Sequence, residues 1–162
     1  MKKVAILIGS VSDKDVVMAA KPYFEYFGIE WELHVSSAHR NPDDVAKFAK
    51  NARQNGYGCL IGGAGMAAHL AGAVAAHSTK PVIGIPIESG GMGGIDSLLS
   101  TAMMPPGVPV ATVAVGKSGA KNSAILAVQI LATSDDDLAR KLKEYKENMR
   151  AEVLEKDKQL NS

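Results

Sequence analysis

The sequence predicts an α/β fold: a doubly wound parallel sheet of flavodoxin-like order, three-layer α/β/α, with a C-terminal helical arm. Two observations predict this fold class. Residues 4–8 form a continuous apolar run, which is typical of a strand buried on both faces. Strand-like runs and helical patterns then alternate strictly along the chain, which favours parallel βαβ units. We expect one domain, with a core of about residues 1–133 and an arm of about 134–160.

The first helix is expected soon after the strand at 4–8 ends. Residues 12–15 resemble a capping box, in which Ser12 caps the helix, and apolar residues follow at helical spacing. Gly28 supplies the C-terminal stop. Pro22 lies inside this segment and is expected to kink the helix.

The second unit pairs a strand at 29–35 with a helix that runs toward Gly56. Apolar and polar residues alternate with period two in the strand, so one of its faces is less buried than in the first strand. Residues 36–40 form its exit loop. Asn41 can cap the next helix, and Pro42 suits the first helical position.

The rest of the core repeats the same alternation. Further strands are expected at 59–61, 81–86 and 110–115, and further helices at 66–77, 96–103 and 122–132. The loops that separate them are expected at 62–65, 89–94 and 117–121. The helix at 66–77 is rich in alanine, so it is expected to pack closely.

The C-terminal segment is a long amphipathic helix, capped by residues 134–137, with one apolar stripe from Leu138 to Leu154. The core already has helices for both faces of the sheet, so this arm is expected to pack on another subunit. Packing on its own subunit is the alternative.

Composition excludes several classes of protein. With 18 Lys and Arg against 17 Asp and Glu, the net charge is +1, too little to bind nucleic acid. The apolar run near the N-terminus is too short for a signal peptide or a membrane span, and Cys59 is the only cysteine. We therefore expect a cytoplasmic protein without disulfides. Cys59 is expected to be buried and inert.

Other residues are interpreted as structural. Met103 and Met104 are expected to pack, whereas His34 and His77 are expected on the surface. The four histidines share no close ligand spacing with a carboxylate, so no metal is expected.

Ligands of open α/β sheets bind beyond the carboxyl ends of the strands, near the point where strand order reverses. For the expected order, this rule selects the loops at 9–13, 36–40 and 62–66. In the first loop, Ser10 and Ser12 offer hydroxyls near a helix N-terminus, which suit a phosphate, and Asp13 could bridge two ribose hydroxyls. The alternative is that Ser12 and Asp13 only stabilise the helix start. The loop is neither a P-loop nor a dinucleotide fingerprint, so a mononucleotide fits better.

In the second loop, His39 stands beside Arg40. An imidazole can exchange protons near neutral pH, and a guanidinium can hold phosphate or carboxylate. The alternative for His39 is an exposed histidine with no role. His69 follows the third loop and could reach the same cleft or be structural.

Several segments together are similar to class I N5-carboxyaminoimidazole ribonucleotide mutase, the PurE family of bacterial purine biosynthesis. They are GSVSD (9–13), SSAHRNP (36–42), GAGMAAHLAG (63–72), PVIGIP (81–86), IDSLLS (95–100) and the long stretch at 104–132. The resemblance implies a flavodoxin-like core, a homo-octamer with exchanged C-terminal helices, and no metal or organic cofactor. It also implies the reaction, in which a carboxylate moves from the exocyclic nitrogen of an aminoimidazole ribonucleotide to a ring carbon, on the route to IMP.

The resemblance also implies roles for individual residues. It assigns His39 as general acid and base. The substrate would be bound by Ser10 near the migrating carboxylate, by Ser12 and Arg40 at the phosphate, by Asp13 at the ribose, and by Ser37, Ala38, Ala64, Gly65 and His69 around them.

Three residues depart from the family pattern. Met66 stands where glycine is usual, Ala71 where proline is usual, and Met103 where glutamine is common. Related class II enzymes carboxylate aminoimidazole ribonucleotide directly with CO2 and carry a lysine after the catalytic histidine, where this chain has Arg40. The mutase is therefore favoured over a class II carboxylase. A nucleotide-binding module without activity is a third alternative.

Overall fold

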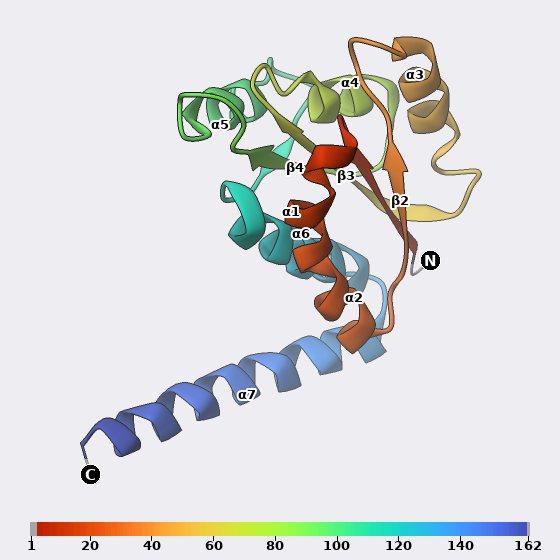
Figure 1. Ribbon diagram of the computed structural model, residues 1–162. Coiled ribbons are helices and arrows are strands. Elements are labelled where there is room, and N and C mark those ends of the chain that lie inside the picture. Colours follow the sequence, from red (N-terminus) through yellow and green to blue (C-terminus); the bar gives the residue numbers. More distant parts are fainter. Residues whose placement is uncertain (1–2, 162) are drawn as a thin grey trace.

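The computed structural model describes residues 3–161 and contains a five-stranded parallel sheet. The strand order is β2-β1-β3-β4-β5, which confirms the predicted flavodoxin-like order. The strands are β1 (Lys3–Ile8), β2 (Glu30–Val35), β3 (Tyr57–Gly65), β4 (Val82–Ile87) and β5 (Ala111–Thr112). Because β1 lies between β2 and β3, the chain reverses its direction of travel across the sheet at β1, and the exit loops of β1, β2 and β3 come together (Figure 1).

The helices form two layers, one on each face of the sheet (Figure 1). They are α1 (Lys14–Val17), α2 (Lys21–Phe27), α3 (Pro42–Asn51), α4 (His69–His77), α5 (Ile95–Ala102), α6 (Gly116–Ala132) and α7 (Asp136–Leu160). One apolar cluster joins β1 to α1, α2 and α6, and a second joins the other face of β1 to α3 and α4. Burial of β1, β3 and β4 on both faces explains why the sequences of these three strands are nearly all apolar.

The first helical segment differs from the expected single kinked helix. It is broken into α1 and α2 by a short 3₁₀ turn at Met18–Ala20. Pro22 explains the break, because it has no N–H to donate to the carbonyl of Met18; Lys21 donates there instead. The segment ends at Gly28 in the left-handed conformation, as predicted.

Two predicted loops are parts of regular elements. Residues 62–65 belong to β3, where Gly62 and Gly63 pair with both β1 and β4 and the next two residues pair with β4. Pairing with neighbouring strands thus overrides the low strand propensity of glycine. A Cβ on Gly62 would lie 2.8 Å from Cα of Ala71, so α4 packs closely on the sheet, as expected from its small residues. Residues 117–121 are the first turns of α6, whose Ala120 is fully buried.

Two other elements are shorter than predicted. Helix α4 begins at His69 rather than at 66, because Met66 and Ala68 have positive φ and form a turn. Strand β5 has only two residues. It lies at the edge of the sheet, and the chain turns into α6 at Gly116.

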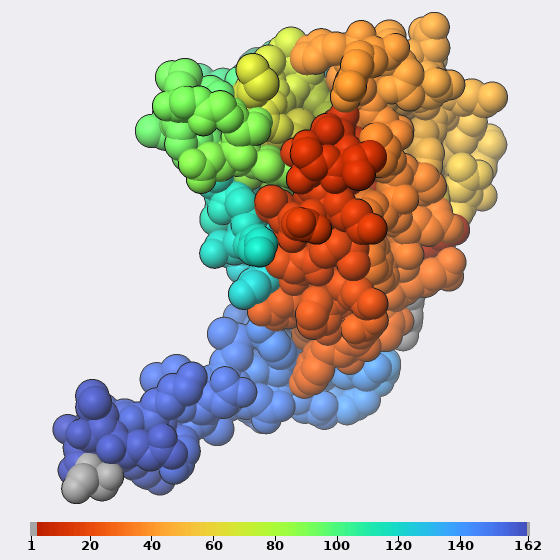
Figure 2. All heavy atoms as spheres, viewed as in Figure 1, coloured from red at the N-terminus to blue at the C-terminus, as the bar shows by residue number. Residues whose placement is uncertain are grey.

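Helix α7 combines the two alternatives considered for the arm. Leu138 is fully buried in the core of its own subunit, and the ring of Tyr145 packs against Phe27 at 5.5 Å between ring centroids. Beyond this point the helix projects away from the rest of the molecule (Figures 1 and 2). Its later apolar residues are exposed, Met149 by 50% and Val153 by 65%. The first part of the stripe therefore packs on its own subunit, and only the later part projects.

One structural assignment made from the sequence was wrong: Met103 is 78% exposed, so it does not pack in this chain. His34 lies at the surface as expected, but its side chain is only 37% exposed, because its ring contacts Phe48 and its Nε2 lies 3.2 Å from Oε2 of Glu32. His77 is exposed as expected. Cys59 is fully buried, and burial raises the pKa of its thiol to about 12.

Candidate active site

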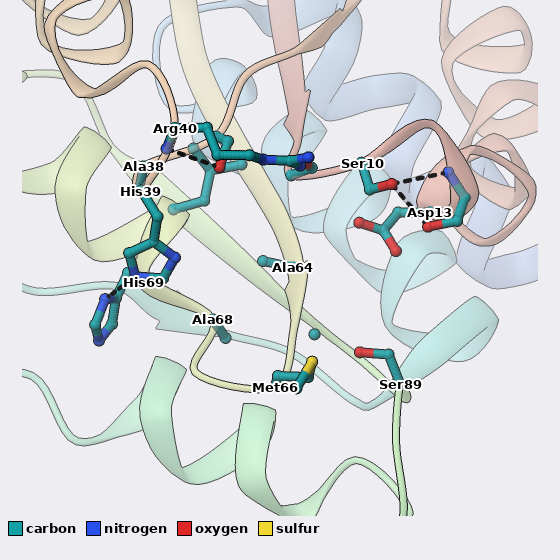
Figure 3. Close-up of a pocket in the computed structure, with 15 residues that line it drawn as sticks. Ser10, Asp13, Ala38, His39, Arg40, Ala64, Met66, Ala68, His69 and Ser89 are labelled. Carbon is teal, nitrogen blue, oxygen red and sulfur yellow. Dashed lines mark hydrogen bonds between the residues drawn. The ribbon is translucent and has the colours of Figure 1, made fainter.

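A cavity of about 430 Å³ lies at the carboxyl edge of the sheet, where the exit loops of β1, β2, β3 and β4 meet (Figure 3). This volume is in the range of small-molecule sites. Every site residue expected from the sequence lines it: Ser10, Ser12, Asp13, Ser37, Ala38, His39, Arg40, Ala64, Gly65 and His69. The loops selected by the rule for ligand sites in open α/β sheets therefore meet at one cavity.

The loop after β1 contributes two hydroxyls and a buried carboxylate. Ser10 is the residue that caps the first helical turn, since its Oγ accepts from the backbone N–H of Ser12. The sequence reading that made Ser12 the cap was wrong, and Ser12 instead donates its hydroxyl to Ser10 Oγ at 2.9 Å. Asp13 is only 8% exposed, and desolvation raises the pKa of its carboxyl, while hydrogen bonds with Ser10 and Ser12 oppose this effect. A carboxylate so poorly hydrated is suited to accept hydrogen bonds from ligand hydroxyls.

The loop after β2 is held in place by its own polar residues. Asn41 Oδ1 accepts from the backbone N–H of Ser37 at 2.7 Å, and Ser37 Oγ accepts from the backbone N–H of Arg40. Asn41 occupies the N-cap position of α3, but its side chain makes no cap hydrogen bond there. Asn41, which was expected to cap α3, therefore fixes the loop that carries His39 and Arg40.

Arg40 reaches across the cavity to the loop after β1. Its Nη2 donates to the carbonyl of Gly9 at 2.6 Å. One guanidinium edge is thus anchored next to Ser10, and the side chain remains exposed to the cavity. The pairing of a guanidinium with two hydroxyls favours an anion such as a phosphate monoester at this end of the cavity.

His39 comes from the loop after β2 and His69 from the first position of α4, and the two side chains meet at the side of the cavity opposite Ser10 and Asp13 (Figure 3). His39 Nε2 lies 2.5 Å from Nδ1 of His69, and the rings are inclined by 64°. One of these nitrogens must carry the proton that the other accepts, so the pair is arranged to hold one proton between two rings. Both side chains are exposed to the cavity. The expectation that His69 could reach the same cleft is correct.

Several lining residues were missed by sequence reasoning. Ser89 enters from the loop after β4, a fourth loop that the switch-point rule did not select. Its place at the start of the glycine-rich segment 89–94 was the available signal. Met66, Ala68 and Leu70 also line the cavity, and with Ala64 they add apolar side chains to its lining.

Comparison with protein-family models gives a match to AIR carboxylase over residues 3–152. The chain belongs to the AIR carboxylase family. Members of this family among curated proteins match nearly the whole chain. The N5-carboxyaminoimidazole ribonucleotide mutase of Thermotoga maritima is 49% identical over 160 residues, which is 99% of this chain and 92% of that protein. The mutase of Bacillus subtilis is 48% identical, with 97% of each chain covered.

A solved structure of a family member agrees with the fold. The crystal structure of Treponema denticola PurE matches with a TM-score of 0.89 and 28% identity, over 99% of both chains. The resemblance seen in the sequence is therefore confirmed at the level of family and fold.

Two further observations concern the described part of the chain. None of its helices is both long and apolar enough to cross a membrane. Between residues 3 and 161, no three His, Cys, Asp or Glu side chains are grouped so that they could hold a metal ion.

Proposed function

We propose that this chain is an N5-carboxyaminoimidazole ribonucleotide mutase. It moves the carboxylate of its substrate from the exocyclic nitrogen to the ring carbon and yields 4-carboxy-5-aminoimidazole ribonucleotide for purine biosynthesis. The curated relatives that are 46–49% identical over most of the chain carry this name. The observation that carries the proposal is the meeting of the His39–His69 pair, Arg40 and the buried Asp13 in one cavity of about 430 Å³.

The polar end of the cavity would bind the ribose phosphate. Arg40, fixed by its bond to Gly9, and the Ser12 hydroxyl provide positive charge and a donor for the phosphate. Asp13 accepts hydrogen bonds from the ribose hydroxyls. These bonds replace the hydrogen bonds to water that the Asp13 carboxylate loses on burial. The base then lies toward the histidine pair, with Ser37 and Ala38 along its side and Ser10 near the migrating carboxylate.

The reaction requires one proton to be donated to the exocyclic nitrogen and one proton to be removed from the ring carbon. In the first half, the bond between the exocyclic nitrogen and the carboxylate carbon breaks, CO2 leaves, and the nitrogen takes a proton from His39. In the second half, the ring carbon attacks CO2, and the resulting adduct loses its ring proton to His39. No proton is gained or lost overall, so His39 returns to its starting state and acts as both acid and base.

His69 supports this shuttle from its position beside His39. Its Nδ1 is within hydrogen-bond distance of His39 Nε2, so it can accept or return the proton that the reacting ring gives up. His69 also restricts the orientation of the His39 ring. We therefore treat His39 as catalytic and His69 as a residue that positions it.

We also propose a homo-oligomer, the octamer expected from the resemblance. The exposed apolar residues of α7 beyond Tyr145 support contact with a second copy, because isolated apolar stripes of this length favour association. A cytoplasmic location, a small-molecule ribonucleotide substrate, and catalysis without a metal or organic cofactor complete the proposal.

Two parallel assays test the reaction. Purified protein in buffer with EDTA and without ATP receives either N5-carboxyaminoimidazole ribonucleotide, or aminoimidazole ribonucleotide with bicarbonate. Rapid formation of the C-carboxylated product from the first substrate is expected. Turnover only from the second substrate pair would favour a class II carboxylase. Binding without turnover in either assay would favour a nucleotide-binding module.

A further inference from the structure

A second cavity, of about 440 Å³, lies next to the active-site cavity. It is formed by the loops after β1 and β2 and by the end of β2, the edge strand of the sheet. Some of its residues do not line the active-site cavity: Val11, Val35 and Asn41. Its polar lining includes residues that both cavities share: Ser10, Ser37 and Arg40. A ligand in the second cavity would therefore meet groups that the active site also uses.

The shared groups suit an anion. Among the described residues that line the second cavity, Arg40 alone has a charged side chain. The guanidinium extends toward the loop of Ser10 (Figure 3), and its Nη2 donates to the carbonyl of Gly9 at 2.6 Å, so its other N–H groups can serve a ligand. Ser10 Oγ and Ser37 Oγ each accept from a backbone N–H, so each keeps its own O–H to donate. A guanidinium and two hydroxyl donors together favour a phosphate group.

Two valines give the second cavity an apolar side. Val11 is 67% exposed and Val35, the last residue of β2, is 54% exposed. A ligand that covers these side chains removes apolar surface from water and gains affinity. The loop of Arg40 is already fixed, because Asn41 Oδ1 accepts from the N–H of Ser37 at 2.7 Å. The second cavity therefore combines a preformed anion site with an apolar surface.

We propose that the second cavity binds a phosphate monoester that has an apolar body, and that this ligand competes with the substrate for Arg40. The phosphate takes N–H groups of Arg40 and the hydroxyls of Ser10 and Ser37, and the apolar body covers the two valines. This inference rests on the proposed mutase function, in which the substrate phosphate binds Arg40 from the active-site cavity. Two phosphates at one guanidinium repel each other, so a ligand in either cavity weakens binding in the other. The second cavity is thus an inhibitory site.

Calorimetry with phenyl phosphate tests the cavity without turnover. Phenyl phosphate carries an apolar ring but no ribose, and methyl phosphate is the comparison ligand with almost no apolar body. The test variant combines Val11→Ser with Val35→Ser, and both valines are more than half exposed, so the fold should be preserved. Ile95→Ser is the matched control, because Ile95 is a β-branched residue that is 59% exposed and lines neither cavity.

We expect wild type to bind phenyl phosphate at least about fivefold more tightly than methyl phosphate, and the double variant to lose this preference. Saturating aminoimidazole ribonucleotide should weaken the binding of phenyl phosphate to wild type. In turnover of N5-carboxyaminoimidazole ribonucleotide, phenyl phosphate should raise the apparent KM of wild type and leave kcat unchanged. Without phenyl phosphate, kcat and KM of the double variant should stay within about twofold of wild type. Ile95→Ser should match wild type in every measurement.

Several results would overturn the inference. Equal affinity of wild type and the double variant for phenyl phosphate would mean that the ring does not cover the valines, and absence of binding to wild type would exclude the site. A KM for substrate that rises in the double variant as much as its affinity for phenyl phosphate falls would make the second cavity part of the substrate site. Affinity for phenyl phosphate that is unchanged by aminoimidazole ribonucleotide would exclude competition for Arg40. Failure of wild type to turn over the substrate would refute the mutase function instead, and the calorimetry would still decide the cavity.

Discussion

Replacing His39 with Asn tests the proton shuttle directly. Asn keeps part of the size and hydrogen bonding of the imidazole but cannot exchange a proton near neutral pH. His39 lies on an exposed loop that is fixed by Asn41 and Ser37, so the substitution should leave the fold and the phosphate-binding groups intact. Binding should therefore survive while turnover fails.

The geometry sets the size of the expected loss. General acid–base catalysis contributes about 10²–10⁴-fold, which corresponds to about 3–5 kcal/mol of transition-state stabilisation. The same imidazole serves both half-reactions, so the loss in kcat should be at least 10²-fold. His69→Asn removes only the contact of 2.5 Å to His39. A net hydrogen bond is worth about 0.5–1.5 kcal/mol, so this variant should lose roughly two- to tenfold.

The assay combines turnover with calorimetric binding of aminoimidazole ribonucleotide. Both variants are compared with His77→Asn, which alters an exposed histidine on α4 outside the cavity. A double variant should lose little more than His39→Asn alone, because the two rings act as one unit. If folded His39→Asn kept more than about a tenth of wild-type kcat, His39 would not be the proton carrier.

Four further predictions follow from other contacts. Arg40→Ala should mainly weaken binding of aminoimidazole ribonucleotide in calorimetry, and kcat should also fall because its bond to Gly9 no longer joins the two loops; unchanged affinity would exclude a phosphate role. Asp13→Asn should raise the Tm of the free protein at neutral pH, because burial raises the pKa of Asp13 and so disfavours its ionised form. This gain in Tm should vanish below about pH 3.8, because the folded and the unfolded chain then both carry the protonated acid. Glu32→Gln should lower the Tm at neutral pH, because hydrogen bonds from Lys3 and Tyr57 lower the pKa of Glu32 to about 2; the difference should shrink as pH falls from 4.5 toward 2, and a difference constant with pH would contradict the ion pair. Deletion of residues 147–162 should reduce the number of subunits in the assembly, measured as mass by light scattering. The subunit should stay folded, since Leu138 remains in its core and Tyr145 remains packed on Phe27. The control variant with Glu155→Ser and Lys156→Ser should leave the mass unchanged.

The sequence alone predicted that strands and helices alternate through the core. It also predicted that the candidate site lies at the carboxyl edge of the sheet. Continuous apolar runs such as 4–8 can be buried only between two helical layers, so they predict a parallel sheet. The expected strand order and the switch-point rule then selected the loops of Asp13, His39 and Gly65, which line one cavity in the structure. The alternation could be predicted because hydrophobic periodicity is a local property of the chain.

Tertiary structure decided where local preferences were overruled. Residues 62–65 are strand because β4 pairs with all of them and β1 with the first two. Residues 117–121 are helix because Ala120 packs in the core. No local pattern in the sequence contains these partners. Asn41, by contrast, holds its own loop through a local contact, since its Oδ1 accepts from the N–H of Ser37, four residues earlier, at 2.7 Å.

The same limit applies to the site. His39 and His69 are 30 residues apart, and their nitrogens come to 2.5 Å because α3, which follows the loop of His39, packs against α4, which begins at His69. Ser89 joins them from a fourth loop, and the positive φ of Met66 arises because β3 runs to Gly65 before the chain must turn into α4. The sequence determines which groups are available for chemistry, because their identities are local. Their distances depend on contacts between distant segments, so only the folded chain fixes them.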